Sequence, residues 1–308
     1  MFSVHSTGRA RFGLAAICLS VALLAGCSMG GMPTAPTRIA LSAKPNSIAV
    51  RASDGALFIT DDTSNSVLLA PDASTFAHYA SIPTVQGQPN SLSQLTFADS
   101  NTLLIERFGF GSAGALFNIP GADTVIELTG SDPARRRLGL AASGPNQVLS
   151  TWFIKNGNQP PQGGLSLLTY DVSAHSVVER DLLSGLGKPV GVVISGDSVF
   201  VSDQANNTIV KASLSAMLAA THPTTTSTVV AHIDSPDLLA IDRSGALYTK
   251  CNATGLCQIA PDGSVKVLAN DFQDARGVAV DRLRLRLYVI DRTTTAGGTS
   301  YLRTFPLN

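Results

Sequence analysis

The sequence predicts an all-β fold, a six-bladed β-propeller with four-stranded antiparallel blades, in which an N-terminal strand closes the last blade. Three observations predict it. A pattern of two short apolar runs around a turn recurs six times within residues 38–308. The copies are 39 to 53 residues apart, the length of one propeller blade. Only 14% of the residues are charged, whereas 44% are hydrophobic and 27 are glycine, a composition typical of strands joined by tight turns.

The six copies align on one apolar position of their first run. Four copies are clear, at 45–61, 189–203, 236–251 and 275–291, and two are weaker, at 92–107 and 137–152. The aligned positions are Val50, Phe97, Ala141, Ile194, Ile241 and Val280. Because one sheet cannot hide both of its faces, neighbouring copies must cover each other and the ring must close. The alternative architecture is a parallel β-helix, but its repeats are shorter and more uniform.

The last two blades can be divided into strands. The fifth is expected at 238–242, 246–251, 256–260 and 264–268. The sixth shows only three apolar runs, at 277–281, 285–291 and 300–306, so residues 38–42 are expected to supply its fourth strand and to join the two chain ends. A short helix at 214–220, followed by a Thr-rich loop at 221–228, explains the longest separation between copies.

Residues 1–26 have the pattern of a secretory signal. Arg9 and Arg11 precede an apolar run, 12–24, that is too short to span a membrane comfortably. The run ends in L-A-G-C, which resembles the lipobox of bacterial lipoproteins and implies cleavage before Cys27 and lipidation of its thiol. Residues 27–37 are then a lipidated flexible tether to a propeller at 38–308. The alternative is an ordinary signal peptide with an accidental Cys.

The lipoprotein resemblance implies a location in the bacterial cell envelope. Ser28, rather than Asp, follows the Cys, which implies the outer membrane, facing the periplasm. Membrane attachment would come from the lipid at Cys27, because the chain without its signal has 20 basic and 22 acidic side chains and no basic excess. This balance also excludes a nucleic-acid binder that relies on general electrostatic attraction. We expect a monomer.

Two cysteines remain for the folded part once Cys18 is removed and Cys27 is lipidated. Cys251 and Cys257, with five residues between them, would face each other across a hairpin. Outside the cytoplasm such a pair favours a structural disulfide. A metal pair or a redox pair is the alternative, but no His or carboxylate lies at zinc-site spacing and the redox motif is C-x-x-C.

Small ligands of propellers bind at the channel mouth, the end of the central channel where the loops leading into the innermost strands converge. The residue four positions before each aligned apolar position should lie there. These residues are Asn46, Ser93, Arg137, Val190, Asp237 and Arg276. Two arginines disfavour a metal ion and would suit a carboxylate, phosphate or sugar acid. The alternative is that these side chains only cap turns or face solvent.

The repeat phrase P-x-x-[IV]-A-V-x-x-x-G-x-[LI]-[FY]-[VI]-[ST]-D resembles the NHL repeat and the blades of the senescence-marker/gluconolactonase family, over nearly all of 38–308. The resemblance implies a six-bladed propeller and leaves the function open, because such propellers include lactonases, lyases and binding modules. The lactonases of this family hold a divalent cation such as Ca²⁺ at the channel mouth.

The resemblance carries over to this chain at one position. Pro236-Asp237 matches the family's P-D-G phrase, with Leu238 in place of Gly, which implies that Asp237 acts as ligand or base. Asn46 stands where the family has Glu, and Val190 stands where it has Asn. We therefore expect no metal and no other cofactor, and a divalent cation such as Ca²⁺ is the alternative.

The remaining motifs have simpler interpretations. Asp61, Asp203 and Asp291 close the second strand of three copies and should accept backbone N–H groups of the following turn. The G-x-G-x-x-G phrase at 109–114 precedes a strand-like run, so a hairpin loop explains it better than a dinucleotide site. Residues 135–137, all Arg, are expected to form a solvated loop from which only Arg137 reaches the mouth.

Trp152, with Phe153 and the loop 156–164, forms either an exposed contact patch or, more simply, a strand end packed between blades. The histidines occupy unrelated repeat positions, and neither G-x-S-x-G nor H-E-x-x-H occurs. The sequence thus predicts an envelope lipoprotein that binds a small anionic or sugar-like ligand, or a partner protein. The alternative is a lactonase-like hydrolase centred on Asp237, and a third hypothesis is a scaffold in envelope assembly.

Overall fold

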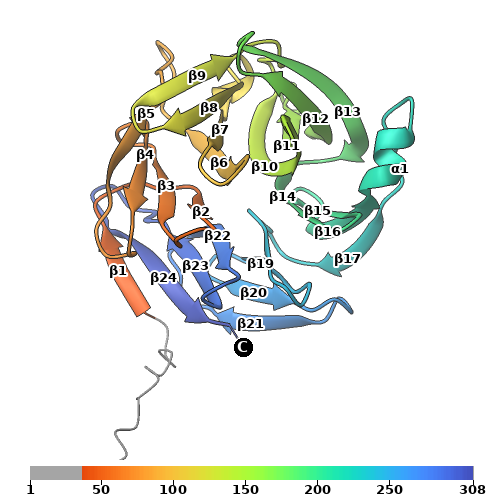
Figure 1. The fold of residues 1–308 in the computed structure, drawn as a ribbon. Coiled ribbons are helices and arrows are strands. Elements are labelled where there is room, and N and C mark those ends of the chain that lie inside the picture. Colours follow the sequence, from red (N-terminus) through yellow and green to blue (C-terminus); the bar gives the residue numbers. More distant parts are fainter. Residues whose placement is uncertain (1–36, 308) are drawn as a thin grey trace, which may run out of the picture. The chain divides into compact units, whose positions relative to one another are not determined.

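The computed structural model describes residues 37–307, and these form a six-bladed β-propeller, as predicted (Figure 1). All strands of these residues belong to six antiparallel sheets of four strands each. The predictions for the signal peptide, for the tether up to residue 36 and for lipidation of Cys27 lie outside the described residues. Within residues 37–307 no helix is long and apolar enough to cross a lipid bilayer.

The blades follow one another along the chain, and each runs from its innermost to its outermost strand. Blade 1 consists of β2 (Ile48–Val50), β3 (Leu57–Asp61), β4 (Ser66–Ala70) and β5 (Ala77–Ser81). Blade 2 consists of β6 (Leu92–Phe97), β7 (Leu103–Arg107), β8 (Ala115–Gly121) and β9 (Thr124–Leu128). Blade 3 consists of β10 (Arg136–Gly144), β11 (Gln147–Ile154), β12 (Gln162–Asp171) and β13 (Ser176–Leu186). Blade 4 consists of β14 (Pro189–Ser195), β15 (Ser198–Asp203), β16 (Thr208–Ser213) and β17 (Thr228–His232).

The last two blades match the strands expected from the apolar runs to within two residues. Blade 5 consists of β18 (Ala240–Ile241), β19 (Leu247–Lys250), β20 (Leu256–Ile259) and β21 (Val265–Ala269). Blade 6 consists of β22 (Ala275–Asp281), β23 (Arg286–Asp291), β24 (Ser300–Pro306) and the N-terminal β1 (Thr37–Leu41). β1 pairs antiparallel with β24, from Thr37 opposite Thr304 to Leu41 opposite Ser300, so the predicted joining of the chain ends is confirmed.

Period-two alternation along the strands builds the core. In β3, Leu57 and Ile59 face blade 6, whereas Phe58 between them faces blade 2, because successive side chains point to opposite faces of a sheet. The same division recurs around the ring, and the described residues contain six apolar clusters, one at each junction of neighbouring blades. Each blade is therefore stabilised by both of its neighbours.

Two shorter elements interrupt the strand pattern. The predicted helix is α1 (Leu214–Ala219), whose N-cap Ser213 accepts a hydrogen bond from the backbone N–H of Ala216. The G-x-G-x-x-G phrase lies between β7 and β8 and contains one 3₁₀ turn, η1 (Gly109–Gly111). No α-helix follows this phrase, so the prediction of a loop is confirmed. In blade 5, Cys251 and Cys257 lie across the β19–β20 hairpin with their sulfur atoms 2.08 Å apart.

Candidate functional site

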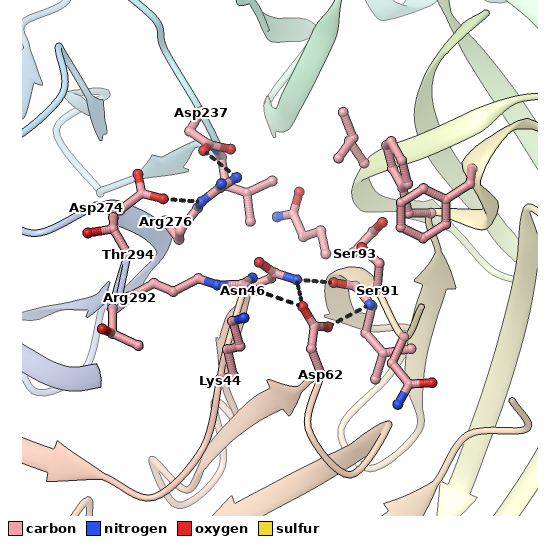
Figure 2. A pocket seen from close by; sticks show the side chains of 18 of the residues that line it. Lys44, Asn46, Asp62, Ser91, Ser93, Asp237, Asp274, Arg276, Arg292 and Thr294 are labelled. Atoms are coloured by element: carbon pink, nitrogen blue, oxygen red, sulfur yellow. Dashed lines mark hydrogen bonds and ion pairs between the residues drawn. The ribbon is translucent and has the colours of Figure 1, made fainter. Parts of the chain in front are cut away.

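A cavity of about 550 Å³ opens at the face where the innermost strands begin (Figure 2). All six blades contribute to this channel mouth, through residues just before or within their innermost strands and through the loops after some second strands. Its lining includes Lys44, Asn46, Asp62, Leu92, Ser93, Phe108, Phe110, Leu138, Lys188, Asp237, Asp274, Arg276 and Arg292.

The closing aspartates of the second strands hold these loops in place. Asp61 accepts the backbone N–H of Lys44 at 2.8 Å and that of Thr63 at 3.0 Å. Asp203 accepts the N–H of Lys188 at 2.9 Å, and Asp291 accepts the N–H of Gln273 at 2.7 Å. The structural interpretation of these aspartates is correct. The main partner is nevertheless the loop that leads into the innermost strand of the same blade, and only Asp61 also binds backbone N–H groups of the turn that follows it.

Four of the six residues that the repeat alignment placed at the mouth line the cavity: Asn46, Ser93, Asp237 and Arg276. Asn46 donates through Nδ2 to Asp62 Oδ2 at 2.7 Å and to the carbonyl of Leu92 at 3.0 Å, and thereby joins blades 1 and 2. Ser93 donates through Oγ to the carbonyl of Arg137.

Arg276 lies between two carboxylates (Figure 2). Its Nη1 is 3.3 Å from Asp237 Oδ2, and its Nε donates to Asp274 Oδ2 at 2.7 Å. The other oxygen of Asp274 accepts from Lys250 Nζ at 2.5 Å. Burial would lower the pKa of Arg276, but the charges of Asp237 and Asp274 outweigh it and raise that pKa. Burial raises the pKa of Asp237, which is only 3% exposed, and Arg276 opposes this shift.

Asp62, which follows β3 of blade 1, forms a second polar centre of the mouth. Its Oδ1 accepts the backbone N–H of Leu92 at 3.0 Å, and its Oδ2 accepts Arg292 Nη2 at 3.0 Å in addition to Asn46. Burial raises the pKa of Asp62 in spite of these donors. Asp62 and Arg292 thus connect blade 1 to blade 6 at the mouth.

The structure corrects the predicted position of Arg137. Its side chain does not line the mouth and is fully buried, with Nη2 2.7 Å from Glu179 Oε2 and Nη1 3.2 Å from Ser150 Oγ. The buried carboxylate of Glu179 draws the guanidinium away from the channel, because a buried charge is stable only when paired. Val190 also lies outside the lining and packs in the apolar cluster between blades 5 and 6.

The predicted solvated arginine loop is wrong as well. Arg135 Nη1 pairs with Glu179 at 2.6 Å and with Asp181 at 2.5 Å, and Arg136 begins β10. The Arg135 guanidinium also lies 3.7 Å from the centre of the Trp152 ring, whose Nε1 donates to Ser166 Oγ at 2.6 Å. Trp152 is half-buried, which favours the strand-end interpretation over the exposed patch.

Several lining residues were missed by the alignment, although a repeat signal exists for them. Asp62, Phe108 and Arg292 each directly follow the last residue of a second strand. Lys44, Lys188 and Asp274 each lie two positions before a residue that the alignment had selected. A mouth built from two loops per blade, instead of one, would have brought all of these residues into the prediction.

The mouth carries more positive than negative side chains. Among the described residues, four cations line it, Lys44, Lys188, Arg276 and Arg292, against three carboxylates. The two arginines pair with those carboxylates, whereas neither lysine has an ion-pair partner among residues 37–307. Burial lowers the pKa of Lys188, whose Nζ donates to Gln204 Oε1 at 2.5 Å.

The oxygen atoms of the mouth do not fit a divalent cation. Among the described residues no group of three or more His, Cys, Asp or Glu side chains converges as metal ligands would. Asp237, which the family resemblance implied as a ligand, already accepts the N–H of Leu238 at 3.0 Å on Oδ1 and faces Arg276 on Oδ2. A guanidinium in this position would repel a dication strongly at low dielectric.

No protein-family model and no curated protein matches the chain. Its fold matches solved structures that include a gluconolactonase from Xanthomonas campestris, with a TM-score of 0.63, 15% identity and 86% of each chain covered. The calcium-binding protein regucalcin from Agrobacterium tumefaciens matches with a TM-score of 0.61 and 14% identity, over 88% of this chain and 94% of that one. Virginiamycin B lyase from Staphylococcus aureus matches with a TM-score of 0.58 and 11% identity, over 88% and 99%. Likeness at such identities shows the fold alone: the chain is a six-bladed β-propeller whose structural neighbours are gluconolactonase-like proteins and related propellers.

Proposed function

We propose that the protein binds a small organic anion at the channel mouth. The observation that carries this proposal is the pair of lysines, Lys44 and Lys188, that line the cavity without a carboxylate partner in residues 37–307. An unpaired, half-buried ammonium such as that of Lys188 gains most from an anionic ligand, because the ligand replaces water in a region of reduced dielectric. Arg276 and Arg292 add donors around the same cavity.

The test compares anions with neutral molecules of similar shape. Gluconate and a panel of mono- and dicarboxylates should raise the melting temperature of the protein, whereas sorbitol should not. Lys188→Met should reduce the shift, and removal of this lysine leaves no buried carboxylate without a partner. Lys266→Met on the exposed outer strand of blade 5 is the matched control and should behave as wild type. Equal shifts by gluconate and sorbitol would overturn the proposal.

The second candidate is a lactonase-type hydrolase. It is favoured by the position of Asp237 at the mouth and by the gluconolactonases among the structural neighbours. Because the mouth does not fit a dication, we expect no Ca²⁺-dependent hydrolysis of glucono-δ-lactone above that of an Asp237→Asn variant. Turnover that requires Ca²⁺ and is lost in this variant would establish the hydrolase instead.

We also propose that the protein is a lipoprotein of the cell envelope, with the lipid on Cys27. The support is the L-A-G-C phrase after the basic and apolar segments. Cells fed a labelled fatty acid should incorporate the label into the wild-type chain and not into a Cys27→Ser variant. Label that persists in the variant would contradict lipidation at this thiol.

A further inference from the structure

The loop after β7 presents a strained and exposed aromatic side chain at the channel mouth. Phe110 has a positive φ of 50° and is 38% exposed. A left-handed backbone at a bulky residue is unfavourable, and an exposed ring forgoes the stabilisation that burial would give. The left-handed backbone and the exposed ring are both unfavourable, and they persist because the surrounding chain imposes them. Residues held in this way are common in ligand-binding segments.

The flanking residues hold this loop firmly. Gly109 and Gly111 have φ values of +70° and +94°, and a Cβ on Gly109 would lie 2.0 Å from the backbone nitrogen of Gly114. The carbonyl of Gly109 accepts the N–H groups of Ser112 and Ala113, each at 3.0 Å. The two glycines that flank Phe110 therefore fix its position, and this gives the G-F-G phrase a role other than dinucleotide binding.

Phe110 is one half of an aromatic pair. Its ring centre is 4.9 Å from that of Phe108, edge to face, and Phe108 in turn lies 6.0 Å from Phe153. Both Phe108 and Phe110 line the cavity, together with Leu92 and Leu138 from blades 2 and 3. We call these two phenylalanines the aromatic platform.

The charged lining comes from the other blades. Lys44 and Asp62 belong to blade 1, Lys188 to blade 4, and Asp237 to blade 5, while Arg292 belongs to blade 6. All charged side chains of the lining thus come from blades 1, 4, 5 and 6, whereas its aromatic rings come from blade 2 alone, beside uncharged polar residues of the same blade such as Ser93 and Gln94. A ligand that is polar all around would leave the aromatic platform without a partner.

We propose that the ligand is an amphipathic organic acid, with a planar apolar ring that packs on the aromatic platform and a carboxylate that faces the lysines. This inference rests on the proposed anion-binding function and narrows it. It disfavours sugar acids, whose hydroxyl groups cover the whole molecule. Aromatic side chains that line a polar cavity provide a large contact area and little loss of conformational entropy.

Calorimetry with four probes tests the inference: 3-phenylpropionate, propionate, gluconate and the neutral 3-phenylpropanol. We expect 3-phenylpropionate to bind at least about tenfold more tightly than propionate or gluconate. This is the affinity ratio expected when contact between two aromatic rings and burial of the ligand's ring both favour binding. In Phe110→Ala this preference should fall to about threefold or less. Phe110→Gly, which also removes the backbone strain, guards against a folding defect and should lose the preference equally.

Leu218→Ala is the matched control, because Leu218 is exposed to the same 38% on α1 and lies outside the mouth. It should leave all four affinities unchanged. Equal affinities for 3-phenylpropionate and propionate, both in the wild type and in Phe110→Ala, would overturn the inference. The proposed function would then still stand. Binding of 3-phenylpropanol as tight as that of 3-phenylpropionate would instead overturn the anion function. Failure of every probe to bind would overturn both.

Discussion

At the residue scale, the most unusual group outside the mouth is Glu106 in β7. It is fully buried, accepts a hydrogen bond from Ser150 Oγ on one oxygen, and has no partner within residues 37–307 on the other. Burial raises its pKa to about 8, although the charge of Arg137 opposes this shift. The carboxyl of Glu106 is therefore mainly protonated at neutral pH.

This raised pKa predicts how stability depends on pH. Between about 4.5, the ordinary value, and about 8, the unfolded chain loses the Glu106 proton and the folded chain retains it. The contribution of Glu106 is thus fully present below the lower value, and it falls as the pH rises, by up to ~1.4 kcal/mol per pH unit. Glu106→Gln, which imitates the protonated form, should flatten this part of the pH dependence. Urea unfolding at pH 5 and pH 8 measures how much the free energy of unfolding changes with pH in each protein. The same change in the wild type and in Glu106→Gln would contradict a buried protonated Glu106.

At the scale of the elements, β1 determines whether the ring is closed. It adds the outermost strand to blade 6, and Leu41 at its end is buried in the cluster between blades 6 and 1. Arg38 supports the same strand, with its guanidinium 3.5 Å from the centre of the Tyr301 ring. Without β1, β24 would present an unpaired edge.

Truncation of the β1 anchor should therefore destabilise the whole ring. Leu41→Ala is expected to lower the free energy of unfolding by ~2–5 kcal/mol, the range for a buried Leu. Val265→Ala in β21, where the side chain is 47% exposed, should change it by ~0.5 kcal/mol or less. Denaturant titrations of both variants test this expectation, and similar losses in the two would show that β1 contributes no more than a surface strand.

The hairpin of blade 5 yields a prediction about oxidation. Cys251 directly follows β19 and Cys257 lies in β20, and their Cα atoms are 5.7 Å apart, within the range that a disulfide requires. Protein purified without reductant should resist alkylation at both thiols, and reduction should expose them. Because the closed loop is short, with a separation of 6 residues, replacement of both by Ser should lower stability by only ~2 kcal/mol. Alkylation of unreduced protein at these residues would contradict the disulfide.

At the scale of the whole molecule, the fold could be predicted from the sequence because its blades repeat one pattern. Each copy places apolar residues on both faces of its second strand, as Leu57, Phe58 and Ile59 do, so six weak signals reinforce one another. The mouth was harder to predict. The repeat predicts where the backbone of Arg137 lies, but the direction of its side chain depends on Glu179. Glu179 belongs to another strand, and no alignment of the copies brings it near Arg137. The platform residue Phe110 lies in the loop after β7, beyond the end of the 92–107 copy on which the alignment depends.

The charge distribution of the molecule predicts the salt dependence of ligand binding. The chain has 22 basic and 22 acidic residues, so attraction for an anion arises at the mouth and not from the surface as a whole. Salt shortens the screening length from ~10 Å at 0.1 M to ~3 Å at 1 M. The dissociation constant of 3-phenylpropionate should therefore rise several-fold between ~0.05 and ~0.5 M NaCl, whereas that of 3-phenylpropanol should not rise. Lys188→Met should reduce the salt slope, because it removes an unpaired charge of the mouth. Calorimetry at the two salt concentrations measures these dissociation constants. A dissociation constant for the acid that does not change with salt would mean that the lysines do not attract the ligand.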